Sequence, residues 1–92
     1  MEYTASDWLT ELQQCHLRRA ARMAFIHHPD NTTLFVEGQA ITLPKSSAAI
    51  AVLLTQQRDF TYQELQKFLK DDFILKLLIE MTNDGFLYFY ED

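Results

Sequence analysis

The sequence predicts a small α+β fold, in which a hairpin and a C-terminal strand form a short antiparallel sheet packed on three helices, with an extra helix at the N-terminus. Residues 34–44 hold two short apolar runs around a two-residue turn that ends in Gly38, which is a hairpin signal. A helical pattern ends at Gly85 and leads directly into the aromatic segment 86–90. That segment must be buried, and the hairpin is the other good strand material nearby.

The chain length predicts one domain over residues 1–92, with an N-terminal helix and lead-in at 1–16 and the main core at 17–92. Ninety-two residues suffice for one modest core but are too few for a deep catalytic cleft plus a cofactor domain. The hydrophobic share of 48% and the charged share of 23% are typical of globular proteins. We therefore expect a folded, single-domain protein.

Cysteine content and hydropathy predict a soluble cytoplasmic protein. Cys15 is the single cysteine, which excludes an intramolecular disulfide and fits a reducing compartment. The N-terminus lacks the layout of a signal peptide, and no apolar run is long enough to cross a bilayer.

The N-terminal third predicts a helix, a strand and a turn. Ser6 is a suitable N-cap for a helix over about 7–14, whose apolar residues recur at helical spacing. The pattern from 16 to 28 is ambiguous between helix and strand, and we interpret 20–27 as a strand. Pro29 and its neighbours then predict a turn.

Three helices are predicted between the hairpin and the C-terminal strand. Ser46 can cap the first, which ends near Gln57. Thr61 and Glu64 have the spacing of a capping box and begin the second. A break at Asp71-Asp72 precedes the third, over 73–83.

Two groups of residues could suggest catalysis, and each has a simpler interpretation. His28 and Asp30 have the His-x-Asp spacing of a non-haem iron site, but no histidine follows to complete the triad, so a plain turn is favoured. Cys15 and His16 could suggest a nucleophile and base, but adjacent side chains point apart, which favours a buried thiol. No catalytic, cofactor-binding or metal-binding residue is predicted.

Two further groups could suggest nucleic-acid binding. Arg18, Arg19 and Arg22 form a basic cluster, for which solvent exposure or salt bridges to the acidic end of the chain are favoured. The aromatic strand 86–90 could stack on bases, but core packing with one exposed face is favoured, because Glu91 and Asp92 follow it.

The net charge of −5 is concentrated towards the C-terminus, where residues 58–92 hold eight acidic and four basic side chains. Such a surface disfavours nucleic acid. It indicates either a basic protein partner or acids that only keep the domain soluble. The candidate partner-binding residues lie at predicted helix ends or at the chain terminus, where we expect them to be exposed: Asp71, Asp72, Asp84, Glu91 and Asp92.

Over residues 17–92 the chain resembles the C-terminal winged-helix domain of the ribosomal oxygenases, which are JmjC-type cupin hydroxylases dependent on iron(II) and 2-oxoglutarate. The resemblance rests on Arg22, the turn at 34–38, the apolar run 48–54, and residues 73–89 with their ending Asn83-Asp84-Gly85-Phe86-Leu87-Tyr88-Phe89. The bacterial members of this family hydroxylate an arginine of a large-subunit ribosomal protein.

The resemblance implies a non-catalytic, winged-helix-like domain that serves assembly or protein-substrate engagement. The cupin barrel of such enzymes, with its iron and 2-oxoglutarate, has no counterpart in this sequence, so the chain is expected to be an excised domain or a stand-alone relative without enzyme activity. The implied partners are a parent cupin domain or a basic ribosomal protein, and dimerisation stays open.

Two other classes remain as alternatives. A winged-helix peptide-binding module would add a peptide strand to an exposed sheet edge. A small DNA-binding regulator would use 72–82 as its recognition helix, but Lys76 is the one base there against Asp72 and Glu80, which weighs against groove binding.

Overall fold

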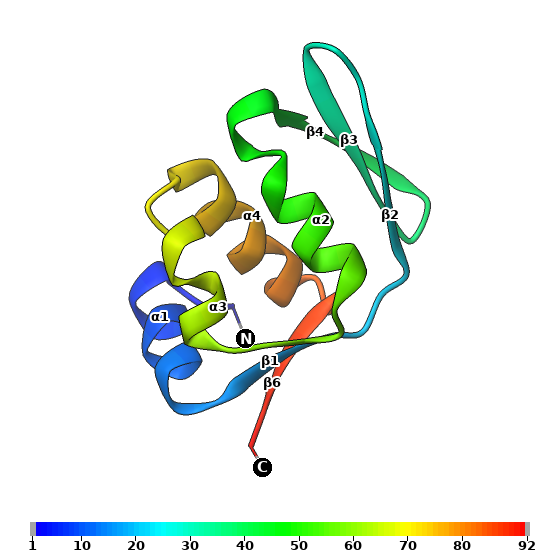
Figure 1. The fold of residues 1–92 in the computed structure, drawn as a ribbon. Helices are drawn as coiled ribbons and strands as arrows, with labels where there is room; N and C mark the ends of the chain where they lie inside the picture. Colours follow the sequence, from blue (N-terminus) through cyan, green and yellow to red (C-terminus); the bar gives the residue numbers. More distant parts are fainter. Residues whose placement is uncertain (1, 92) are drawn as a thin grey trace. The chain divides into compact units, whose positions relative to one another are not determined.

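The computed structural model describes residues 2–91, and the fold class is α+β, as predicted. The described residues form four α-helices and two antiparallel three-stranded sheets, consistent with a winged-helix-like fold (Figure 1). Contacts within the chain divide it into two compact units, which we call unit 1 (Met1–Ala20 and Asp59–Asp92) and unit 2 (Ala21–Arg58). That residues 1–92 act as a single domain stays a prediction.

Unit 1 begins with helix α1 (Ala5–Gln14), which buries Trp8 and Leu12 on one side. The predicted N-cap at Ser6 is wrong, because Ser6 already lies in the first turn. Thr4 is the N-cap instead: its backbone is extended, and its hydroxyl accepts a hydrogen bond from the backbone N–H of Asp7 at 3.2 Å.

The sheet of unit 1 has β1 (His16–Arg19) at its centre, between β5 (Asp59–Phe60) and β6 (Leu87–Tyr90). The predicted pairing of the C-terminal strand with the hairpin is therefore wrong, since β6 pairs with β1 (Figure 1). Strand β1 itself was not predicted. Alternation along the strands places Leu17 and Phe60 together on the buried face.

The remaining helices of unit 1 are α3 (Tyr62–Leu65), continued by a 3₁₀ turn, and α4 (Asp72–Asn83). The capping box of Thr61 and Glu64 is confirmed, with both reciprocal hydrogen bonds present. Helix α4 ends in a Schellman motif at Gly85, whose φ of 86° favours glycine. This motif reverses the chain directly into β6.

Unit 2 is a three-stranded meander of β2 (Met23–His27), β3 (Asn31–Val36) and β4 (Gln39–Pro44), together with helix α2 (Ala49–Gln56). The hairpin is confirmed, with Glu37 and Gly38 both at positive φ, 49° and 84°. The predicted strand 20–27 is confirmed for its last five residues.

Two expectations for unit 2 need correction. The hairpin finds its third strand in β2 and not in the C-terminal strand. Ser46 does not cap α2, because residues Lys45–Ser47 form a 3₁₀ turn that leads into the helix without a side-chain cap. Across residues 2–91, none of the helices combines the length and apolar character needed to cross a membrane.

Candidate functional site

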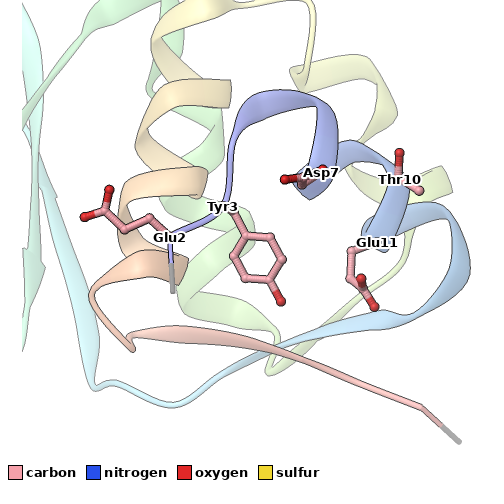
Figure 2. Close-up of a pocket in the computed structure, with 5 residues that line it drawn as sticks. All are labelled: Glu2, Tyr3, Asp7, Thr10 and Glu11. Atoms are coloured by element: carbon pink, nitrogen blue, oxygen red, sulfur yellow. The ribbon is translucent and has the colours of Figure 1, made fainter.

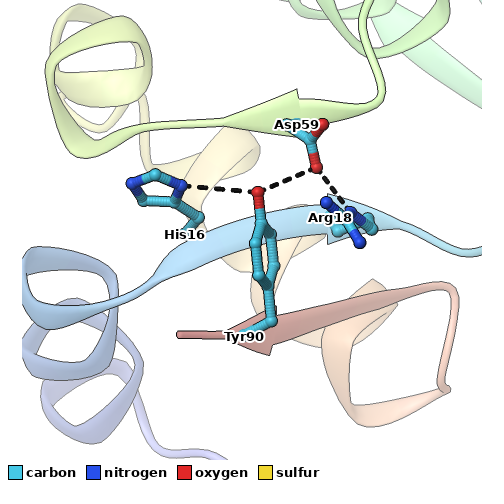
Figure 3. Close-up of polar contacts among 4 residues, drawn as sticks. All are labelled: His16, Arg18, Asp59 and Tyr90. Atoms are coloured by element: carbon cyan, nitrogen blue, oxygen red, sulfur yellow. Dashed lines mark hydrogen bonds and ion pairs between the residues drawn. The ribbon is translucent and has the colours of Figure 1, made fainter. Parts of the chain in front are cut away.

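The outer face of the unit 1 sheet carries a polar cluster made of His16, Arg18, Asp59 and Tyr90, contributed by all three strands (Figure 3). Asp59 Oδ1 accepts hydrogen bonds from Arg18 Nε at 2.6 Å and from the Tyr90 hydroxyl at 3.1 Å. The His16 Nδ1 atom lies 3.4 Å from the same hydroxyl. The Arg18 guanidinium also lies over the Tyr90 ring, 4.0 Å from its centroid.

The electrostatics of this cluster favour a structural role over acid–base chemistry. Burial, followed by the hydrogen bond to Asp59, raises the pKa of Tyr90, so its hydroxyl stays protonated at neutral pH. The hydrogen bond to Asp59 likewise raises the pKa of Arg18 and holds it charged. The ion pair confirms that one arginine of the basic cluster bridges to the acidic end of the chain. The cluster ties β1, β5 and β6 together.

The aromatic strand β6 divides its side chains between the two faces of this sheet. Phe89 contacts the rings of Tyr3 and Trp8, with centroid separations of 5.4 Å and 5.8 Å. Tyr88 points to the opposite face and is 39% exposed. Core packing with one exposed aromatic face is therefore confirmed.

A pocket of about 350 Å³ opens beside α1 and is lined by acidic side chains. Among residues 2–91, its lining includes Glu2, Tyr3, Asp7, Thr10 and Glu11. Figure 2 shows the Tyr3 ring and the Glu11 carboxylate projecting in the same direction, while the Glu2 side chain points away from them. Burial, followed by the negative charge of Glu11, raises the pKa of Tyr3. The pocket thus combines an aromatic wall with negative charge.

The Cys15 thiol is buried, as predicted, and it lies between two carboxylates. Its Sγ atom is 3.2 Å from Glu11 Oε1 and 3.9 Å from Glu91 Oε1. The hydrogen bond to Glu11, followed by burial, raises the pKa of Cys15 to about 11. A thiol in this setting is a poor nucleophile at neutral pH.

Alkylation of Cys15 by iodoacetamide is expected to follow this raised pKa. The thiolate is the reactive form, so the rate should keep rising as pH approaches about 11. Glu11→Gln removes the main cause of the shift, and its pH–rate profile should move to lower pH. Glu80→Gln, an exposed change on α4, is the matched control and should leave the profile unchanged. A wild-type profile centred on an ordinary thiol pKa would contradict this description.

The predicted partner-binding acids do not form one cluster. Asp72 is exposed in the first turn of α4, whereas Asp84 is exposed at its other end, about 18 Å along the helix axis. Glu91 is exposed beyond β6, and Asp92 lies outside the described residues. The acids therefore spread over unit 1.

The expected exposure of Asp71 is wrong. Asp71 is half-buried and is the N-cap of α4, because its carboxylate accepts hydrogen bonds from the backbone N–H groups of Phe73 at 2.9 Å and Ile74 at 3.4 Å. The pocket acids Asp7 and Glu11 were not predicted as site residues. Their i, i+4 spacing on the predicted N-terminal helix was the signal that places them on one face.

His28 and Asp30 lie in the turn between β2 and β3, and both are exposed. The Nε2 atom of His28 contacts Thr33 Oγ1 at 3.2 Å. Within residues 2–91, no three histidine, cysteine, aspartate or glutamate side chains come together as a set of metal ligands. The absence of a metal from the protein stays a prediction.

Charge is divided unequally between the two units. Unit 1 holds eleven of the thirteen acidic residues and five of the eight basic residues, a net charge of −6. Unit 2 holds the remaining two acids and three bases, a net charge of +1, which restores the chain total of −5. The acidic character is a property of unit 1.

Comparison of the chain with models of protein families gives no match, and comparison with curated proteins gives no significant match.

Proposed function

We propose that this chain is a non-catalytic interaction domain that engages a basic protein, in the manner of the ribosomal oxygenase domain it resembles. The partner is a basic ribosomal protein, with the parent cupin domain as the other candidate. The net charge of −6 on unit 1 carries the proposal, because a surface with an excess of one charge steers and orients an oppositely charged partner.

The exposed carboxylates of unit 1 support this proposal. Among residues 2–91, Asp72 and Asp84 are exposed and form no ion pair with another side chain. Glu2 before α1 and Asp7 in its first turn are also exposed, and both line the pocket beside Tyr3. Carboxylates that are not neutralised within the chain remain open to lysine and arginine side chains of a partner.

The geometry of α4 disfavours a DNA-binding regulator. Lys76 is exposed on this helix, but Asp72 and Glu80 are exposed on it too. Two acids on the helix that would enter the major groove repel phosphates. The proposal includes no enzyme activity and no iron or 2-oxoglutarate in this chain, and it includes a cytoplasmic location.

The test is a titration of the isotope-labelled chain with a basic ribosomal protein, followed by amide chemical shifts. We expect the shifts to concentrate in unit 1, at α1 and at the two ends of α4. Asp72→Asn with Asp84→Asn should weaken binding by about three- to tenfold at low ionic strength, because two attractive charges are lost. Asp71 is left intact because it caps α4.

The matched control is Asp30→Asn with Glu37→Gln, which removes the same charge from unit 2. Binding should change by less than about twofold, because these side chains lie outside the proposed surface. Equal weakening by the two double variants would mean that only net charge matters. Shifts centred on unit 2 would contradict the proposed surface.

A further inference from the structure

We draw no further inference here: the strongest candidate, the pocket beside α1 where the Tyr3 ring lies next to Asp7 and Glu11, is a cluster of acidic side chains that belongs to the surface already proposed for the partner, and among residues 2–91 no buried side-chain polar atom without a hydrogen bond points into it to show what else it would bind.

Discussion

Trp8→Ala is expected to lower the free energy of unfolding by about 3–5 kcal/mol, which would remove much of the stability of a chain this size. Trp8 is fully buried, and its ring packs at 5.8 Å from the ring of Phe89. Its Nε1 atom donates a hydrogen bond of 2.9 Å to Thr82 Oγ1, which links α1 to α4. The substitution therefore leaves a large cavity and removes a buried hydrogen bond. Thermal unfolding followed by circular dichroism should show a Tm lower by roughly 12 °C or more.

Trp8→Phe distinguishes the effect of the cavity from the effect of the lost hydrogen bond. Phenylalanine retains most of the buried ring area but cannot donate to Thr82, whose own hydroxyl still donates to the carbonyl of Leu78 at 2.7 Å. The free energy of unfolding should therefore fall by about 1–2 kcal/mol. An alanine variant as stable as the phenylalanine variant would show that the ring is not packed as described.

Leu34→Ala is expected to lower the free energy of unfolding by about 2–5 kcal/mol. Leu34 is fully buried at the centre of the unit 2 sheet, where it pairs with Phe25 on one side and Ile41 on the other. Trp8 is the single tryptophan of the chain and reports on unit 1. Because the sequence predicts one domain, Leu34→Ala should lower the midpoint of the transition followed by Trp8 fluorescence.

Thr42→Val is the control for this substitution, since Thr42 is exposed and valine keeps its shape. Thr42→Val should change the free energy of unfolding by no more than about 0.5 kcal/mol. The contrary result has two parts: Leu34→Ala leaves the midpoint of the fluorescence transition unchanged, and part of the circular dichroism signal is lost at a lower temperature than that midpoint. The two units would then unfold independently. That result would contradict the single domain.

Local signals in the sequence predicted the elements that depend on local chemistry. The Glu37-Gly38 turn needs two positive φ angles, and glycine at its second position favours them. The capping box at Thr61 and the helix end at Gly85 are likewise decided within a few residues. These features are fixed by backbone groups that need nearby partners.

The pairing of the strands was not predictable in the same way. Strand β1 has the sequence His-Leu-Arg-Arg, with no β-branched residue and one buried side chain. It forms because Phe60 and Phe89 cover Leu17 from the flanking strands, and both partners are remote in sequence. The assumption that the C-terminal strand joins the hairpin overlooked this central strand.

The candidate surface was predicted in its charge but not in its layout. The acidic residues of 58–92 predicted the negative charge of the surface. Asp72, Asp84 and Glu91 are exposed as expected. Asp71 differs because the free N–H groups at the start of α4 need an acceptor, and its carboxylate supplies one. The spacing of Asp7 and Glu11 places them on one face of α1, but their position beside Tyr3 depends on the tertiary structure.

The affinity of the chain for a basic ribosomal protein, measured as a function of ionic strength, tests directly whether unit 1 engages basic proteins. Electrostatic engagement by unit 1 predicts binding that weakens steeply as salt is raised, and that is stronger than binding to lysozyme, an equally cationic control. Asp72→Asn with Asp84→Asn should flatten the salt dependence. Binding that is absent, or no stronger than binding to lysozyme, would contradict this role of unit 1 and leave the acids as a solubility feature.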